Sequence, residues 1–72
     1  MKTIEITTEF IKLQDLLKFA SLVSTGGEAK IVIAGEAVCV NGERCTQRGK
    51  KIRPGDVVTY NGMDLTVSYA DQ

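Results

Sequence analysis

The period of the hydrophobic pattern changes twice along this chain, and this constrains the fold more than any other feature. Residues 3–7 alternate apolar and polar side chains, which is typical of a short edge strand. Apolar residues then recur every three or four positions over residues 8–22, which predicts an amphipathic helix. After a second helical segment, alternation returns over residues 38–69. This order predicts an α+β fold with two helices on a small, mainly antiparallel sheet.

The second helix begins with a capping signal. Thr25 and Glu28 have the spacing of a capping box, in which the two side chains accept hydrogen bonds from amides at the start of the helix. We expect a helix over residues 26–34, with Gly35 ending it in the left-handed conformation. Its apolar face consists of Ala29, Val32 and Ile33.

Three turn motifs punctuate the region of alternating pattern. Asn41-Gly42 and Asn61-Gly62 are typical of two-residue hairpin turns, and Arg53-Pro54-Gly55-Asp56 is typical of a type II turn. In the first hairpin, Cys39 faces Arg44 and Cys45 faces Val38, so the two thiols point to opposite faces and a disulfide is disfavoured. In the last hairpin, one face is expected to be the core face: Val58, Tyr60, Met63, Leu65 and Val67.

The composition excludes several classes of function. The chain has 72 residues and no histidine, which removes Ser-His and Cys-His catalysis, and its two cysteines are too few for a zinc site built on cysteine alone. It contains neither a membrane-spanning apolar stretch nor a signal peptide pattern. We therefore expect a single domain over residues 1–72: a cytoplasmic, monomeric, non-enzymatic protein without cofactor, metal or small-molecule substrate.

The net charge of zero is a sum of unlike segments. Residues 44–53 contain five bases and no acid, whereas the flanking regions are acidic on balance. We call residues 44–53 the basic segment; its bases are Arg44, Arg48, Lys50, Lys51 and Arg53. Such a flexible cationic connection suits a phosphate backbone, because arginine and lysine neutralise phosphates and release counterions. The alternative is a solvated loop whose charge keeps the chain soluble.

The outward side of the second helix is unusually bare. It presents Gly27, Lys30, Ile31 and Ala34, with Gly26 at its edge and no acid. Two glycines in the first turn leave the free amides open to an anion, and the helix dipole and Lys30 favour one there. The alternative is that another strand or helix packs on this smooth face. The spacing does not match a P-loop, so nucleotide hydrolysis has no support.

Four short motifs follow one another along the chain: residues 12–18 (KLQDLLK), 25–30 (TGGEAK), 38–42 (VCVNG) and 53–58 (RPGDVV). With these motifs, the chain resembles the S4-like RNA-binding domains over residues 8–67, in particular the small stand-alone bacterial proteins of that family. The resemblance implies a two-helix S4-like (alpha-L) motif on a small sheet. It also implies binding of structured RNA, with ribosomal or transfer RNA as the usual target and ribosome assembly or translation as a plausible context.

The resemblance also implies site residues. Thr25, Gly26, Gly27 and Lys30 match the start of the RNA-facing helix, and Lys12 matches an arginine that often opens the first helix. The basic stretch matches at Thr46, Arg48, Gly49, Lys50 and Lys51, with Gln47 in place of a second arginine. Glu36 stands where the family usually has glycine. The expected RNA-binding residues are Lys12, Thr25, Gly26, Gly27, Lys30, Arg44, Arg48, Lys50, Lys51 and Arg53.

A protein-interaction adaptor on ribosomal particles is the alternative function. In that case Ile31 and Ala34 would contact a partner protein, and the chain itself would not contact RNA.

Overall fold

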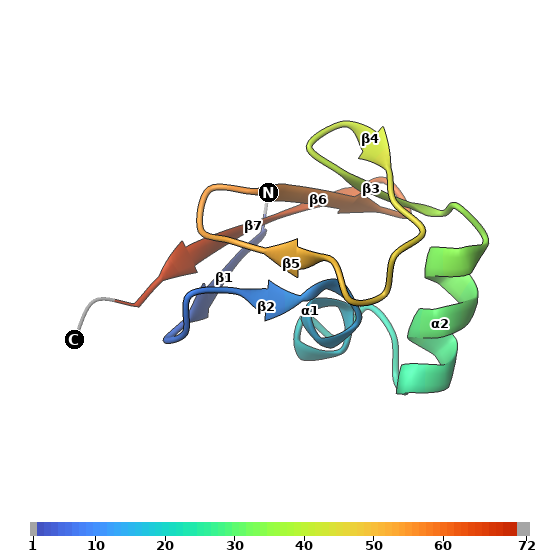
Figure 1. Ribbon diagram of the computed structural model, residues 1–72, viewed down its shortest axis with the longest axis horizontal. Coiled ribbons are helices and arrows are strands. Elements are labelled where there is room, and N and C mark those ends of the chain that lie inside the picture. Colours follow the sequence, from blue (N-terminus) through green and yellow to red (C-terminus); the bar gives the residue numbers. More distant parts are fainter. Residues whose placement is uncertain (1, 71–72) are drawn as a thin grey trace.

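Residues 2–70 form two helices and two sheets, which are shown in Figure 1. The computed structural model describes residues 2–70; residues 1 and 71–72, the ends of the predicted 1–72 domain, lie outside the described residues. The elements in chain order are β1 (Lys2–Ile6), β2 (Ile11–Lys12), α1 (Leu13–Phe19), α2 (Gly26–Ala34), β3 (Val38–Val40), β4 (Glu43–Arg44), β5 (Lys51–Ile52), β6 (Val57–Tyr60) and β7 (Met63–Tyr69).

The main sheet has five strands in the order β1-β7-β6-β3-β4. Its pairs are antiparallel except for β1, which lies at the edge parallel to β7. Both predicted hairpin registers are confirmed, since Cys39 pairs with Arg44 and Tyr60 pairs with Met63. The type II turn is also confirmed, because Gly55 has φ +96 and the Asp56 amide donates to the Arg53 carbonyl at 3.0 Å. Both cysteines are free.

The core lies between the helices and one face of the main sheet. The β6–β7 hairpin contributes Val58, Leu65 and Val67, as the alternation predicts, while Tyr60 is half-buried and Met63 is exposed at the turn. The remaining core residues are Ile4, Ile6, Leu13, Leu16, Leu17, Ala20, Val23, Ala29, Ile33, Val38, Val40 and Ile52. Among the described residues, neither helix has the length and hydrophobicity to span a membrane.

The first helix is shorter than the predicted range of 8–22. Residues 11–12 form β2, which pairs with β5 in a separate two-stranded sheet, and the helix begins only at Leu13. Ser21 (φ +61) ends it, with the Leu22 amide donating to the Leu17 carbonyl at 3.0 Å in a Schellman arrangement. The predicted helix begins too early because Phe10 fits its apolar stripe, although Phe10 lies outside the helix.

The range of α2 is confirmed, but the prediction that Gly35 takes the left-handed conformation is wrong. Gly35 has φ −80, and Glu36 takes the left-handed conformation at φ +62. The Ala37 amide donates to the Val32 carbonyl at 3.1 Å, which again completes a Schellman motif. The left-handed residue that follows the helix is therefore Glu36, one position after Gly35.

Glu36→Gly should therefore stabilise the protein. The left-handed conformation costs an ordinary residue about 1–2 kcal/mol, and the greater freedom of glycine in the unfolded chain offsets part of the gain. We expect the free energy of unfolding in urea to rise by about 0.5–1 kcal/mol. Glu43→Gly, in a strand, should lower it. A loss of stability in Glu36→Gly would contradict this assignment of the helix end.

Candidate nucleic-acid interface

The two-stranded sheet of β2 and β5 places bases on an exposed face. Ile11 pairs with Ile52, and Lys12 pairs with Lys51. Ile52 is fully buried and Ile11 packs against the core, so the next residue on each strand points outward. Lys12 and Lys51 thus lie directly opposite each other on an exposed surface. Like charges in this position destabilise a strand pair, and an anion between them would relieve the repulsion.

The basic segment is fixed to the start of α1 by backbone hydrogen bonds. The amides of Leu13 and Gln14 donate to the carbonyls of Lys50 and Arg48, at 2.9 and 3.1 Å. These are two of the amides that a helix N-terminus leaves without an intrahelical partner. In Figure 1 the segment passes beside α1 before it enters β5, on the side where α2 lies.

The basic segment, expected to be a flexible connection, is held by hydrogen bonds at several points. Arg44 lies in β4, Lys51 and Ile52 form β5, and the Cys45 amide donates to the Val38 carbonyl at 3.0 Å. Two interactions fix the path of its backbone. The apolar side chain of Ile52 is buried in the core, and the first amides of α1 need acceptors, which the segment supplies.

The start of α2 has the opposite character, because it is open. Thr25 Oγ1 accepts a hydrogen bond from the Glu28 amide at 3.1 Å, and Glu28 Oε1 accepts one from the Ser24 amide at 2.7 Å. The capping box is confirmed, with one difference. The Glu28 carboxylate accepts from the amide of Ser24, one residue before the N-cap residue Thr25. Among residues 2–70 no acceptor reaches the amides of Gly26 and Gly27.

No packing demand inside the protein explains the two glycines. An added Cβ on Gly26 would have nothing within 4 Å, and one on Gly27 would meet only Thr25 Oγ1 at 3.8 Å. Lys30, Ile31 and Ala34 on the same face are exposed. Within the described chain, the alternative of a second element packed on this face is thus excluded. The Glu28 carboxylate lies close to these amides and reduces their attraction for an anion.

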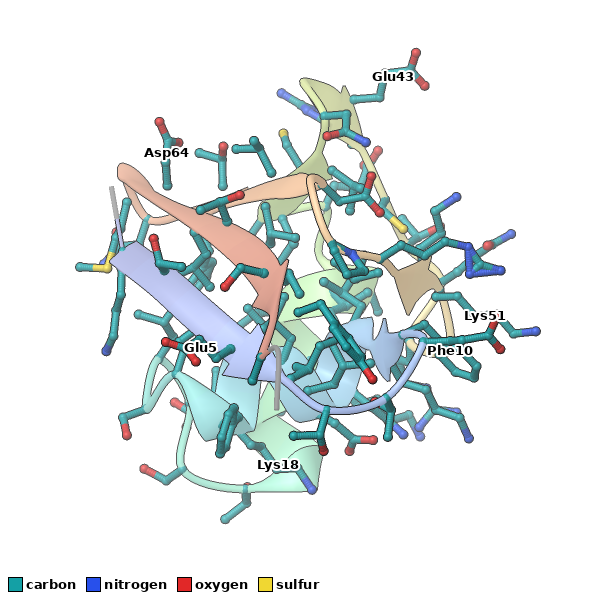
Figure 2. The ribbon with its side chains drawn as sticks, turned by 90° about the vertical axis from the view of Figure 1, so that its left-hand side faces the viewer. Glu5, Phe10, Lys18, Glu43, Lys51 and Asp64 are labelled. Atoms are coloured by element: carbon teal, nitrogen blue, oxygen red, sulfur yellow. The ribbon has the colours of Figure 1, made fainter. Side chains whose placement is uncertain are left out.

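The bases of the interface have no acidic partners in the described part of the chain. There the one ion pair joins Lys18 to Asp15, at 3.6 Å. Asp56 borders the basic segment, but its carboxylate accepts hydrogen bonds from the Arg53 amide and the Asn41 side chain. In Figure 2 nitrogen-tipped side chains gather around Lys51, while the labelled Glu5, Glu43 and Asp64 lie elsewhere.

The structure brings some of the predicted site residues together and separates others. Lys12, Lys51 and Arg53 gather at the β2–β5 sheet, and Arg48 and Lys50 lie where the segment contacts α1. Arg44 lies in β4 and lines an open hollow with Lys50, in which the acids Glu43 and Asp56 also take part. The residues at the start of α2 form a separate group: no hydrogen bond or ion pair within residues 2–70 joins them to the other bases. This second group comprises Thr25, Gly26, Gly27 and Lys30.

Sequence reasoning missed Phe10, whose ring lies among these bases. Lys51 Nζ is 4.9 Å from the ring centroid, and the guanidinium carbon of Arg53 is 5.8 Å from it. Both distances lie within the range of a cation–π interaction. In the sequence, Phe10 fits the apolar stripe of the helix predicted over residues 8–22, so nothing there distinguishes it from a core residue. The only signal in the sequence is the pair of cations at 51 and 53. The pairing of β2 with β5, which brings these cations to Phe10, is not visible in the sequence.

Hydrogen exchange should distinguish the two helix starts. We expect the Leu13 and Gln14 amides to exchange at least about tenfold more slowly than those of Gly26 and Gly27, after correction for intrinsic rates, because only the first pair has acceptors. Amide exchange followed by NMR measures all four. Equal protection at the two helix starts would contradict the anchoring of the basic segment on α1.

Comparisons with known proteins agree with this architecture. A family model described as the S4 domain matches residues 4–68. A Bacillus subtilis (strain 168) protein, described as a probable ribosome maturation protein, RlbA, is 42% identical over 59 residues, which are 82% of this chain and 83% of the relative.

Two solved structures share the fold. The solution structure of YbcJ from E. coli, described as revealing an alpha-L motif involved in RNA binding, matches with a TM-score of 0.73 and 33% identity, over 94% of this chain and 87% of that one. The 30S ribosomal protein S4e from Thermoplasma acidophilum matches in fold with a TM-score of 0.68 and 24% identity, over 92% of this chain and 35% of that one.

Proposed function

Since the chain belongs to the S4 domain family, we propose that it binds structured RNA, of the ribosomal or transfer RNA class, without catalysing a reaction. One observation carries the proposal: the exposed face of the β2–β5 sheet sets Lys12 opposite Lys51, with Arg53 close by and no carboxylate paired with any of them among residues 2–70. A surface of this kind is stabilised by the anion that it binds.

The similarity to a probable ribosome maturation protein and to a structure with an RNA-binding motif supports the same proposal. It suggests a role in ribosome assembly or translation. The protein would act there as a cytoplasmic monomer that needs no metal or cofactor.

Two surfaces would contact the RNA with unequal strength. The β2–β5 sheet and the basic segment would bind consecutive phosphates, because their bases project from a fixed backbone. The open amides of Gly26 and Gly27, with Lys30, would bind a further phosphate, weakened by the neighbouring Glu28 carboxylate. Neither surface presents an evident set of groups for reading base edges. Recognition would therefore depend on the shape and backbone of folded RNA.

The adaptor function has one observation in its favour. Ile31 is 72% exposed on the outward face of α2, next to the exposed Ala34. A partner protein could bury this side chain. The patch is small, however, and it adjoins Lys30 and the open amides, which suit an anion better than an apolar surface.

RNA binding should be strongly dependent on salt. If four or five phosphates are neutralised, a plot of log affinity against log salt should have a slope of roughly −3 to −4.5. Lys51→Glu should weaken binding and reduce this slope by roughly 1 or more, because it removes a contact and adds a like charge. Lys18→Glu changes the net charge equally at a position on α1 that Figure 2 shows apart from Lys51, and should have a much smaller effect. Fluorescence anisotropy with a ribosomal RNA fragment measures both variants.

Ile31→Asp separates the two functions. The RNA proposal expects it to weaken RNA binding less than Lys51→Glu does. Affinity that is indifferent to salt, or equal in Lys51→Glu and Lys18→Glu, would overturn the proposal. Loss of a protein partner only in Ile31→Asp, with no RNA bound by the wild-type protein, would favour the adaptor.

A further inference from the structure

The exposed face of the β2–β5 sheet carries an aromatic ring as well as bases. Ile52 is fully buried and the partly buried Ile11 packs against the core, so the alternation of side chains places Lys12 and Lys51 on the outer face. Phe10 directly precedes β2 and Arg53 directly follows β5, and the ring of Phe10 contacts both Lys51 and Arg53. Three cations and one phenyl ring therefore share one small surface.

The ring contacts two of these cations. Phe10 is half-buried, and both Lys51 Nζ, at 4.9 Å, and the Arg53 guanidinium, at 5.8 Å, lie over its ring. The negative face of an aromatic ring attracts a cation, and the aliphatic stems of lysine and arginine pack well on such a surface. Figure 2 shows Phe10 and Lys51 side by side at the edge of the molecule.

A ring is well suited to this place because of the electrostatics of phosphate binding. Lys12, Lys51 and Arg53 repel one another, and a carboxylate that relieved this repulsion would cancel their charge and repel phosphate. An aromatic quadrupole attracts the cations without carrying a net negative charge. The ring can thus fix the two side chains before RNA arrives while their full charge remains available to it.

We propose that Phe10 is a positioning residue of the RNA-binding surface, which holds Lys51 and Arg53 in place to bind consecutive phosphates of the RNA backbone. This inference rests on the proposed function. It assigns a role to a residue without charge or hydrogen-bonding groups, which charge counting along the sequence does not find.

The test compares the same substitution at two phenylalanines. Phe10→Leu keeps an apolar side chain but removes the ring, and we expect roughly three- to tenfold weaker RNA binding, the range for losing the preorganisation of one long side chain. The magnitude of the salt slope should also fall, because unfixed cations neutralise fewer phosphates. Phe19→Leu makes the same change at a side chain that is 63% exposed on α1, and affinity should not change.

Phe10→Trp provides a gain-of-signal test. Indole is the strongest cation–π partner, so this variant should bind RNA at least as tightly as the wild-type protein. The chain contains no other tryptophan, so its emission reports on this one position. We expect the emission to change when a ribosomal RNA fragment is added and to return when salt releases the RNA.

A merely structural role for Phe10 predicts different results. Lower stability alone would reduce the folded fraction in Phe10→Leu, which circular dichroism detects, but would leave the salt slope of the folded protein unchanged. If Phe10→Leu binds as tightly as Phe19→Leu while Lys51→Glu still weakens binding, the positioning role is overturned and the proposed function stands. If the wild-type protein shows no salt-dependent binding of RNA, the proposed function fails and this inference fails with it.

Discussion

The hydrogen bonds between the start of α1 and the basic segment are the interactions on which the rest of the surface depends. The Leu13 and Gln14 amides need acceptors, and the carbonyls of Lys50 and Arg48 supply them. This contact brings Lys51 beside Lys12 and allows Ile52 to enter the core. The bases therefore project from a backbone that is fixed by the helix, and less conformational freedom is lost when they bind a ligand.

The neutral composition gives this surface a particular physical character. Nine bases and nine acids cancel over the whole chain, so long-range attraction to a polyanion is weak. Lys51 and its neighbouring bases nevertheless have no ion-pair partner among residues 2–70, and Figure 2 shows Lys51 on the opposite side of the view from Glu5 and Asp64. A protein of this kind gains its electrostatic energy only at short range, where the fit to a folded RNA decides how many phosphates it reaches.

The local patterns of the sequence predicted the elements that depend on local interactions. The capping box gave the range of α2, and the Asn-Gly turns gave both hairpin registers. The β2–β5 sheet could not be predicted in this way, because two-residue strands are too short to show an alternation and their partners are far apart in the chain. Of the candidate site, the list of bases followed from charge counting. The gathering of Lys12, Lys51 and Arg53 on one face, and the place of Phe10 among them, required the tertiary contact.

The central claim is that one anchored face of a neutral protein binds RNA. Amide chemical shifts in an NMR titration with a structured ribosomal RNA fragment test it most directly, because they report on every element at once. The account predicts that the shifts concentrate in residues 10–14 and 44–53, with smaller changes at residues 25–31. The amides of β1 and of the turn between β6 and β7 should remain unperturbed. Shifts concentrated on β1 and β7, or spread evenly over the chain, would contradict it.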